Sequence, residues 1–376
     1  MTNTTQNLSL EELRYFIALS LAPKIGPSIF KAIIAYAGSA QNFFKLPKGK
    51  VLKTPKVGSK LLELRNQEQE LIRKADELIK TCEKSGYRIF TPLDSDFPSR
   101  LKVQEDSPVL FFAKGSGSLN FERSVGIVGT RSATQYGKTA TRKIIEDLAI
   151  YQPAIVSGLA YGIDIEAHRA ALAVGLPTIA VMGSPINQIY PAVHRKTAES
   201  ILESGLVMSE YVPGSKMSPG NFPARNRIIA SLSDALIVVE AAEKGGALIT
   251  AEIAYSYDKD VFAVPGNLQS PFSEGCNQLI KKMKANIYTG PGDIAEALYW
   301  VKPGEQAIKN PKLDLSKYEG EEAIILKHLM EKGESEIDLI SYSTEIPLGL
   351  LSSKLLALEF EGILKSLPGK KYKLLG

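Results

Sequence analysis

Arg131 stands in a short glycine-containing segment, Gly129-Thr130-Arg131, that directly follows an apolar run. The segment lacks the GxGxxG spacing of dinucleotide sites, and an arginine occupies the place where a pyrophosphate needs bare backbone. A guanidinium can form two parallel hydrogen bonds with a phosphate, and the start of a helix near Gly137 adds backbone donors. These residue types predict an anion site at this segment.

A second segment, Ser157 to Asp164, contains two glycines, Gly158 and Gly162, that permit the close approach of a phosphate. We expect the Ser157 hydroxyl and the backbone amides to donate to it. His168, in the helix that follows, is interpreted as a histidine bonded to a neighbouring loop rather than as a catalytic base, because no Ser or Cys nucleophile motif accompanies it. Asp164 is interpreted as a helix cap rather than as an acid.

The third segment is the richest in groups that recognise nucleotides. It holds Asn221, Phe222, Arg225, Asn226 and Arg227. A guanidinium binds phosphates, and an aromatic face stacks a base. Two arginines only two positions apart at the start of a helix cannot face the same way. An alternative therefore stays open, in which one of them pairs with an internal carboxylate such as Glu240.

The fourth segment runs from Glu240 to Glu252 and contains Lys244-Gly245-Gly246 at the expected start of a helix, where an anion is favoured. The same residues fit a different class of protein. Rossmann-like nucleotide hydrolases place a Gly-Gly-x-x-Thr-x-x-Glu stretch at a helix start, and residues 245–252 resemble it. In this alternative, a nucleoside monophosphate hydrolase, the glycines bind the phosphate and Glu252 acts on the ribose.

Short β-branched runs alternate with amphipathic helices from about residue 85 to residue 300, which predicts a parallel, doubly wound α/β sheet. The predicted strands are Val125–Val128, Ala154–Val156, Thr178–Val181, Leu206–Ser209, Ala235–Val239 and Val261–Val264, with extra strands at Tyr87–Phe90 and Val109–Ala113. Ligands of such sheets bind at the carboxyl ends of the strands. We therefore expect the four segments to gather at that edge.

The sequence before and after the predicted sheet region indicates two further, largely helical domains. Apolar spacing is helical between residues 9 and 80, where two turns, Pro23–Pro27 and Pro55–Ser59, resemble helix-hairpin-helix turns; loops that merely join the helices of a bundle are an equal alternative. Near the C-terminus, expected helices at 321–331 and 348–361 precede a hairpin at 362–375, which suggests a winged helix-turn-helix. The predicted domains are 1–82, 83–302 and 315–376, with a linker at 303–314.

Composition excludes several classes of protein. The 376 residues, 44% hydrophobic and 23% charged, are typical of a globular chain of two or three domains. No apolar run reaches the roughly 18 residues of a membrane span, and the first residues are polar, so a cytoplasmic location is expected. Cys82 and Cys276 form no CxxC pair and the histidines are scattered, which argues against a disulfide framework or a zinc site. Neither a metal nor a cofactor is expected.

The net charge of +4 is unevenly distributed. Residues 1–80 contain 13 Lys and Arg against 7 Asp and Glu, whereas residues 315–376 contain 8 against 10. The middle of the chain is therefore close to neutral, and a polyanion bound there must be held by placed cations and backbone amides rather than by bulk charge. The acidic C-terminal domain is expected to add little to such binding.

Six blocks, in this order, strongly resemble the DNA-processing protein A (DprA, also called Smf) family: SVGIVGTR, SGLAYGID with AHRAAL, TIAVMG with IYP, FPARNRIIASLSDALIVVEA, GGALITAEIA and VFAVPG. The resemblance covers about residues 85–300. It implies a Rossmann-like doubly wound sheet with extra strands, flanked by a small helical N-terminal domain and a C-terminal winged-helix domain. It also implies a non-enzymatic, single-stranded DNA-binding protein of natural transformation, which protects incoming strands, promotes loading of the RecA recombinase and forms a homodimer through the Rossmann-like domain.

The family's motifs place the expected DNA contacts on particular residues of this chain. Its Gly-Ser/Thr-Arg motif matches Gly129 to Arg131, its glycine-rich loop matches Ser157 to Asp164, and its Arg-Asn-Arg block matches Arg225 to Arg227, with Phe222 as the stacking residue. The full expected set is Gly129, Thr130, Arg131, Ser157, Gly158, Gly162, Arg195, Lys216, Asn221, Phe222, Arg225, Asn226, Arg227 and Lys244, with no catalytic residue. The chain departs from the family after Met182, where Gly-Ser-Pro-Ile-Asn replaces Gly-x-Gly-x-Asp, and at His194, which replaces an Asn.

Overall fold

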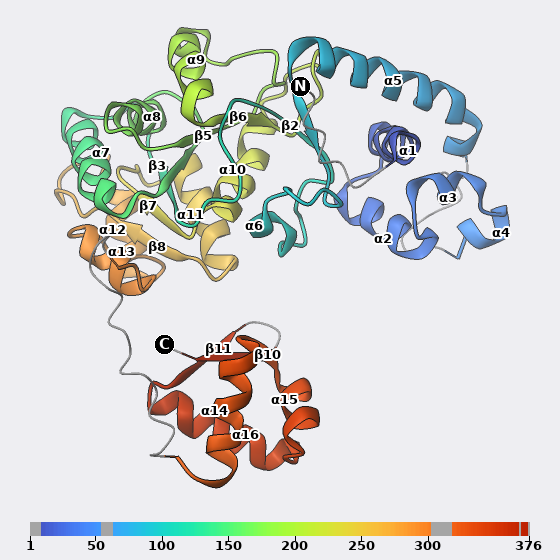
Figure 1. The fold of residues 1–376 in the computed structure, drawn as a ribbon. Coiled ribbons are helices and arrows are strands. Elements are labelled where there is room, and N and C mark those ends of the chain that lie inside the picture. Colours follow the sequence, from blue (N-terminus) through green and yellow to red (C-terminus); the bar gives the residue numbers. More distant parts are fainter. Residues whose placement is uncertain (1–8, 54–62, 302–317, 368–369, 375–376) are drawn as a thin grey trace. The chain divides into compact units, whose positions relative to one another are not determined.

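The computed structural model describes residues 9–53, 63–301, 318–367 and 370–374 (Figure 1). They belong to two compact units, one within Met1–Trp300 and one within Val301–Gly376. The first unit contains both the N-terminal helices and the large sheet, so the domain boundary predicted after residue 82 lies inside it. The predicted linker at 303–314 and the second predicted hairpin turn, Pro55–Ser59, lie outside the described residues.

A nine-stranded sheet with the order β1-β2-β6-β5-β4-β3-β7-β8-β9 forms the centre of the first unit. The strands are β1 (Arg88–Phe90), β2 (Phe111–Lys114), β3 (Ser124–Val128), β4 (Ala154–Ser157), β5 (Thr178–Met182), β6 (Leu206–Ser209), β7 (Ala235–Val238), β8 (Asp260–Ala263) and β9 (Asn286–Ile287). All strands from β6 to β9 in this order pair in parallel, and β1 and β2 add an antiparallel edge. The predicted doubly wound α/β sheet with extra strands is confirmed.

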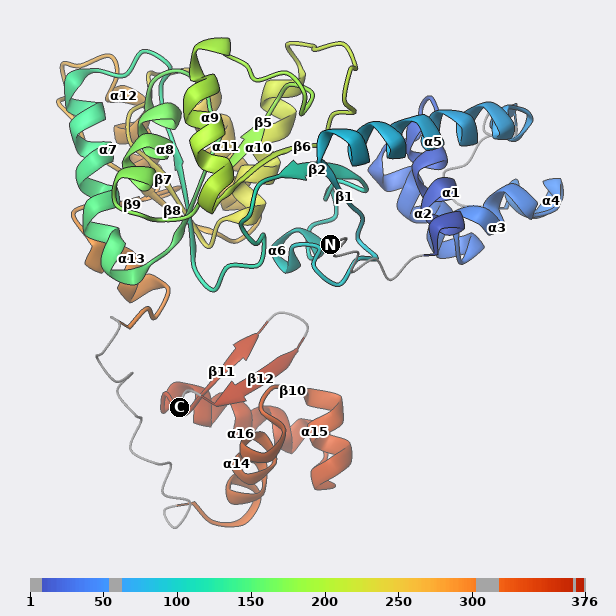
Figure 2. The ribbon, with the colours of Figure 1, turned by 45° about the horizontal axis from the view of Figure 1, so that its top comes forward.

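Helices cover both faces of the sheet, which is why the central strands are apolar along their whole length. The residues of β3 alternate between two cores: Ile127 packs with α7 (Gln135–Leu148), α8 (Ile163–Ala173) and α13 (Pro291–Ala297), whereas Val128 packs with α10 (Asn221–Leu232), α11 (Gly246–Ser256) and α12 (Glu274–Lys281) (Figure 2). The helix α9 (Arg195–Ser204) packs with β5 and β6 in a third core.

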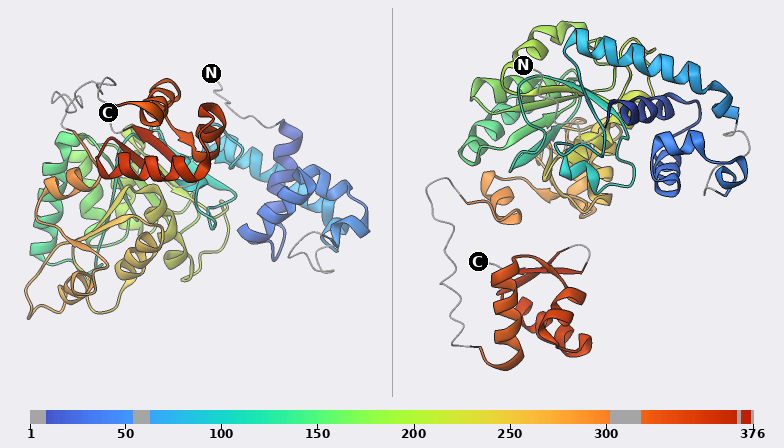
Figure 3. Two further views of the ribbon diagram at one scale, coloured as in Figure 1. Left: turned by 90° about the horizontal axis from the view of Figure 1, so that it is seen from below. Right: turned by 45° about the vertical axis from the view of Figure 1, so that its right-hand side comes forward.

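The N-terminal helices form a small bundle beside the antiparallel edge of the sheet (Figure 3, right). They are α1 (Leu10–Leu21), α2 (Pro27–Ala37), α3 (Ala40–Lys45), α4 (Lys48–Val51) and α5 (Glu68–Ser85), while the short α6 (Ser99–Lys102) follows β1. Ser9 caps α1, and Gly26 and Pro27 begin α2 after the first predicted hairpin turn. The Lys31 ammonium donates to the carbonyl of Glu105 and so joins this bundle to the region between β1 and β2.

The described residues of the second unit form three helices and a three-stranded antiparallel sheet of order β10-β12-β11. Its elements are α14 (Gly320–Lys332), β10 (Ser335–Glu336), α15 (Ile337–Thr344), α16 (Leu348–Phe360), β11 (Leu364–Leu367) and β12 (Lys371–Leu374). The two predicted helices and both hairpin strands are present. The sequence pattern did not predict α15 and β10, because both are short and neither has a periodic run long enough to stand out.

Candidate functional site

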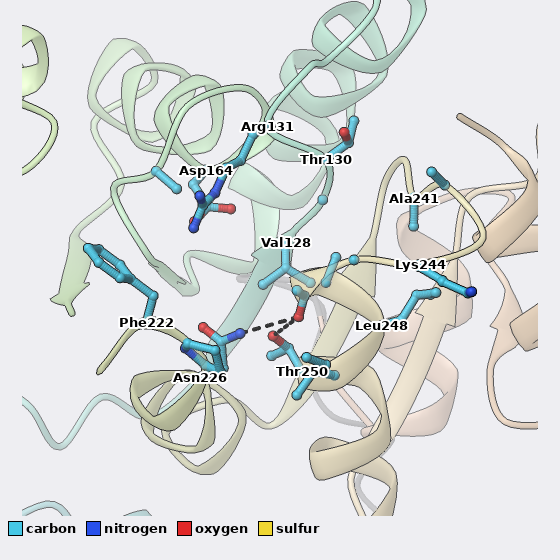
Figure 4. Close-up of a pocket in the computed structure, with 18 of the residues that line it drawn as sticks. Val128, Thr130, Arg131, Asp164, Phe222, Asn226, Ala241, Lys244, Leu248 and Thr250 are labelled. Carbon is cyan, nitrogen blue, oxygen red and sulfur yellow. Dashed lines mark hydrogen bonds between the residues drawn. The ribbon is translucent and has the colours of Figure 1, made fainter. Parts of the chain in front are cut away.

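A pocket of about 800 Å³ opens at the carboxyl edge of the sheet, between the segments that follow β3 and β7 (Figure 4). Because β4 lies on one side of β3 and β7 on the other, this is the point where the strand order reverses, and ligands of doubly wound sheets bind there. The lining residues are Val128–Arg131, Ala160, Asp164, Phe222, Pro223, Arg225, Asn226, Ile229, Ala241–Thr250 and Glu252. All four predicted segments thus contribute to one pocket.

Arg131 and Phe222 face each other across this pocket (Figure 4). The Arg131 side chain is exposed, and its Cζ lies 5.8 Å from the centroid of the half-buried Phe222 ring. Within the described residues, no carboxylate lies at salt-bridge distance from this guanidinium. An exposed cation with no salt bridge and a neighbouring aromatic ring can hold an anionic group and a planar ring at the same time.

The position of the Phe222 ring depends on Gly183. A Cβ at Gly183 would lie 2.7 Å from Cδ1 of Phe222, so only glycine allows the ring to sit this close to the backbone. On its other side, Tyr190 packs at a tilt, with ring centroids 5.5 Å apart. Gly183 follows β5, at the place where the sequence departs from the pattern of the family that it resembles. Sequence reasoning singled out that departure but did not assign Gly183 a role.

The two glycine segments after β3 and β4 pack directly on each other. The Ile163 amide donates to the Thr130 carbonyl at 3.2 Å. Gly162 has a left-handed backbone with φ of 77°, and a Cβ there would overlap the same carbonyl. Gly162 therefore serves the packing of the loops, and its predicted contribution to a bound phosphate is indirect.

The start of α7 is already occupied by a carboxylate of the protein itself, which corrects the anion site predicted there. Glu240, after β7, accepts from the Thr134 amide at 2.9 Å and from the Thr134 hydroxyl at 2.5 Å, while that hydroxyl also caps α7 at Gly137. A side chain at Gly137 would overlap the Glu240 carboxylate. Since Glu240 fills the helix start, an external anion must bind at Arg131 or at α11 instead.

Arg225 is buried, with 3% of its surface exposed. Its Nη1 donates to the Gly158 carbonyl at 2.7 Å and to the Val181 carbonyl, and its Nε donates to Asn226 Oδ1 at 3.2 Å. Burial lowers the pKa of this guanidinium to about 10. Arg225 therefore fastens the loop after β4 and the strand β5 to α10, and its hydrogen bonds leave it poorly placed for the phosphate contact predicted from the sequence.

Gly158 fits between Arg225 and Asp164. A Cβ at Gly158 would lie 2.5 Å from both Nη2 of Arg225 and Oδ2 of Asp164. Asp164 is buried in the first turn of α8, and this burial raises the pKa of its carboxyl, against the opposing effect of the nearby Arg225 charge. The helix cap expected at Asp164 is not observed, because Gly162 is the N-cap of α8 and Asp164 lies in the first turn. Its carboxyl accepts from the backbone at Ala160 and Gly158, so its role is still structural.

Arg227 points away from the pocket. Its Nη2 lies 2.6 Å from Glu210, its Nε donates to the Asp106 carbonyl at 3.0 Å, and only 15% of its side chain is exposed. The alternative in which one arginine of the pair binds an internal carboxylate is thus the observed one, but the carboxylate is Glu210 and not Glu240. Neither arginine presents a free guanidinium, because Arg225 and Arg227 both serve the packing around α10.

Asn226 and Ser157 also have internal partners. Asn226 Nδ2 donates to the Gly246 carbonyl at 3.2 Å and so joins α10 to the start of α11 (Figure 4). The Ser157 hydroxyl is buried and donates to the Ile127 carbonyl at 2.6 Å. The expectation that Ser157 donates to a bound phosphate does not fit this geometry, since its only hydroxyl proton is used between two strands.

The start of α11 lines the pocket with Lys244, Gly245 and Gly246, all of them exposed. Within the described part of the chain, no carboxylate lies at salt-bridge distance from Lys244. Glu252 of α11 also lines the pocket, but its two carboxylate oxygens lie 2.8 and 2.6 Å from Nζ of Lys284. This end of the pocket therefore presents a cation and backbone donors, as predicted.

The remaining predicted residues lie outside the pocket. Arg195 begins α9 and Lys216 lies in the segment before α10; both are exposed, and neither lines the pocket. Asn221 begins α10, where its carbonyl accepts from the Tyr211 hydroxyl at 3.1 Å. A role for these three residues in binding stays a prediction.

Two of the three histidines are buried near the site. His168 Nδ1 lies 2.7 Å from the Thr178 hydroxyl, and burial lowers its pKa to about 3. Its partner is thus the first residue of β5 rather than a loop. His194 Nδ1 lies 2.7 Å from the Leu159 carbonyl, in the glycine-rich segment. Both rings hold structural positions, and neither lines the pocket.

The described residues hold neither a metal-binding cluster nor a membrane-spanning helix. They contain no group of three or more His, Cys, Asp or Glu side chains that could hold a metal ion. They also contain no helix that is both long and apolar enough to cross a bilayer. Both free cysteines, Cys82 and Cys276, are buried.

The fold and the site define a doubly wound α/β protein with a pocket at its switch point, lined by an exposed arginine and an aromatic ring. The model of the DNA recombination-mediator protein A family matches residues 88–299, more than half of the chain, and the chain belongs to this family. Protein Smf of Synechocystis sp. is 33% identical over 96% of this chain and 98% of its own length. DNA processing protein DprA of Streptococcus pneumoniae is 41% identical over 55% of this chain and 73% of its own length.

Solved structures agree with this assignment. The crystal structure of DprA from Streptococcus pneumoniae has 32% sequence identity and a TM-score of 0.64, and the match covers 79% of this chain and 98% of that one. A structure of DNA processing protein A from Helicobacter pylori, solved to explain its single-stranded DNA binding mode, has 31% identity and a TM-score of 0.51 over 57% of this chain and 95% of that one. The predicted family is confirmed.

Proposed function

We propose that this protein binds single-stranded DNA in the pocket between β3 and β7. The observation that carries the proposal is the exposed guanidinium of Arg131, which lies 5.8 Å from the Phe222 ring and has no carboxylate partner among the described residues. A phosphate and an unpaired base are the two groups that this pair fits, because a duplex hides the faces of its bases. The Helicobacter pylori relative, described as binding single-stranded DNA, supports the same reading.

The residues predicted to bind DNA divide into contacts and supports. Arg131 binds a backbone phosphate, Phe222 stacks a base, and Lys244 with the amides at Gly245 and Gly246 binds a second phosphate. Arg225, Arg227, Asn226 and Ser157 hold the loops in place through their internal hydrogen bonds. Gly129 and Thr130 border Arg131; because the Thr130 amide donates to the Glu240 carbonyl at 2.7 Å, Thr130 contacts the strand through its hydroxyl. Arg195, Lys216 and Asn221 are outer contacts to a longer strand.

The cellular role that we propose follows the family. The protein protects incoming single strands during natural transformation, promotes their transfer to the RecA recombinase in the cytoplasm, and acts without chemical turnover. It does so as a homodimer through the Rossmann-like sheet domain, since two linked pockets raise the avidity for one strand without any new contact. The element order α14-β10-α15-α16-β11-β12 supports a winged helix for the C-terminal unit.

An enzyme alternative has one specific observation in its favour, since the Gly245–Glu252 segment does line the pocket. Against it, Lys284 engages the carboxylate that a nucleoside monophosphate hydrolase would use on the ribose. Incubation of the purified protein with each nucleoside monophosphate decides between the two functions. Release of the free base supports the hydrolase, whereas intact nucleotide after prolonged incubation supports a binding protein.

The experiment that tests the main proposal compares a labelled single-stranded oligonucleotide with its matched duplex by fluorescence anisotropy across a range of salt concentrations. The single strand should bind more tightly at every concentration, with little dependence on sequence, because phosphates and base faces are recognised rather than groove edges. Its affinity should fall steeply with salt. A duplex that binds as tightly as the single strand contradicts the proposal.

A further inference from the structure

The N-terminal bundle carries a cluster of four lysines that the single-strand pocket does not use. Lys45 ends α3, Lys48 and Lys50 lie in α4, and Lys53 follows it; all four side chains are exposed. Within the described residues, none of them has a carboxylate at salt-bridge distance. We call these four residues the lysine cluster. It falls in the segment that gives residues 1–80 their excess of positive charge.

Apolar anchors fix the backbone that carries the lysine cluster. Phe43, Phe44 and Val51 are buried, with at most 3% of their surface exposed. The guanidinium of Arg65 donates to the carbonyls of Phe44 and Leu46 and so closes the end of α3. The lysines therefore project from an ordered surface rather than from a loose tail.

Three carboxylates of the N-terminal bundle have partners away from the lysine cluster. Glu12 accepts from the amides of Ala40 and Gln41, at 2.7 and 3.3 Å, and thereby caps the start of α3, the end opposite Lys45. The neighbouring Glu11 binds the Gln41 side chain. On α5, Asp76 pairs with Arg14 at 2.5 Å. Because these acids have partners away from the lysine cluster, its charge is not neutralised by them.

We propose that the lysine cluster binds the sugar-phosphate backbone of duplex DNA, as a second nucleic-acid surface separate from the single-strand pocket. Charge alone would also attract a single strand, but single-strand sites add aromatic side chains on which bases stack. The only aromatic residues from Gly38 to Lys53 are Phe43 and Phe44, and both are buried. The nearest exposed aromatic residue before this stretch, Tyr36, is 40% exposed and belongs to α2 rather than to the lysine cluster. Lysines with no aromatic ring among them fit a partner that exposes phosphates and conceals its bases.

The two surfaces lie on different parts of the first unit. The pocket is at the carboxyl edge of the sheet, whereas α3 and α4 lie in the part of the helical bundle remote from the strands (Figures 1 and 2). A protein with these two surfaces can hold a single strand and a duplex at once. Duplex binding through four lysines is expected to be weaker than single-strand binding and independent of sequence, because phosphates carry no sequence information.

The test replaces the lysine cluster as a whole, with Lys45→Gln, Lys48→Gln, Lys50→Gln and Lys53→Gln in the full chain. A matched control removes the same charge from four other exposed lysines, Lys80, Lys84, Lys281 and Lys282, also by glutamine. A second variant changes the four cluster lysines to arginine and keeps the charge. Anisotropy then measures the affinity of all four proteins, the unmodified one included, for a 30-base-pair duplex and for a short single-stranded oligonucleotide.

The glutamine variant of the lysine cluster should bind the duplex at least about tenfold more weakly at low salt. Its slope of log affinity against log salt should fall by up to about 4, roughly one unit for each lost phosphate contact. The control and the arginine variant should stay within about threefold of the unmodified protein, and the short single strand should bind all four alike. Thermal melting checks that each variant is folded.

Three results would overturn the proposal. The unmodified protein could fail to bind the duplex at low salt, the control could lose as much duplex affinity as the cluster variant, or the cluster variant could lose single-strand affinity to the same extent, which would make the cluster part of a single-strand path. Failure of the single-strand proposal is a separate outcome. It appears as an unmodified protein that does not bind the short oligonucleotide, whatever the duplex does.

Discussion

The carboxylate of Glu240 binds both the backbone amide and the hydroxyl of Thr134, at 2.9 and 2.5 Å. Glu240, which follows β7, thus fills the start of α7, the helix that follows β3. The contact ties together the ends of β3 and β7 at the switch point. This contact removes one candidate anion site and leaves Arg131, the start of α11 and Phe222 as the groups that face a ligand. The contribution of this contact to the free energy of unfolding is tested first.

Gly137→Ala should destabilise the protein, because the added methyl group would overlap the Glu240 carboxylate. We expect the free energy of unfolding to fall by about 1 to 3 kcal/mol, the usual cost of overpacking a well-packed site. Gly49→Ala in α4 is the control, since no neighbouring heavy atom lies within 4 Å of its added Cβ. Urea unfolding measures the free energy of unfolding of both variants. Equal values for Gly137→Ala and Gly49→Ala would show that the Glu240 carboxylate can move aside without loss of stability.

Arg131→Ala should weaken single-strand binding about 10- to 100-fold, which is the usual effect of losing a charge-assisted hydrogen bond to a phosphate. Arg169→Ala is the matched control. Arg169 is also an exposed arginine of the same unit, but it does not line the pocket. Anisotropy titrations at one salt concentration compare the two. An Arg131→Ala protein that is folded and binds normally would remove this segment from the site.

Phe222→Ala should also lower single-strand affinity, by roughly 1 to 3 kcal/mol if the ring stacks on one base. Phe222→Trp should keep most of the affinity, since an indole offers a larger stacking face. A third variant, Gly183→Ala, keeps the Phe222 side chain but displaces its ring, because the new Cβ would lie 2.7 Å from Cδ1. If Phe222→Ala and Phe222→Trp bind with the same affinity, stacking plays no part.

The buried His168 should make the protein less stable in mild acid. Its pKa in the folded protein, about 3, lies below the ordinary value of about 6.5. Between about pH 3 and pH 6.5 the unfolded state therefore binds a proton that the folded state does not bind. Stability should therefore rise with pH across this window, and this residue alone should cost about 2 kcal/mol at pH 5 relative to pH 8. Unfolding curves of the unmodified protein and of His168→Asn at both values isolate the effect. Equal pH dependence in the two proteins would refute it.

Removal of residues 312–376 should change single-strand affinity only a few-fold, a difference of about 1 kcal/mol or less. Lys354, the only cation of α16, lies 2.8 Å from Glu322, and the exposed face of the helix carries uncharged residues such as Ser353, Leu356 and Phe360. Phosphates find little to bind there. A truncated protein of unchanged oligomeric state that binds a hundredfold more weakly would show that the C-terminal unit contacts the strand.

The sequence alone was enough to predict the sheet and the edge at which the site lies. Runs such as Ala235–Val239 are apolar along their whole length, and only a strand covered on both faces needs that pattern. The polar and glycine-rich segments between these runs had to gather at the carboxyl edge, because parallel strands all end there. The same reasoning missed α15 and β10, which are short and have no periodic pattern.

Tertiary structure decided which of the polar side chains are available to a ligand. Arg131, Arg225 and Arg227 are chemically identical in the sequence, and each stands near glycines or asparagines. Folding leaves Arg131 exposed, places Arg225 against the carbonyls of Gly158 and Val181, and pairs Arg227 with Glu210. Glu210 lies 17 positions before Arg227, and Gly158 lies 67 before Arg225. A buried guanidinium must find acceptors wherever the chain brings them, and spacing along the sequence does not encode which distant carbonyl or carboxylate that is.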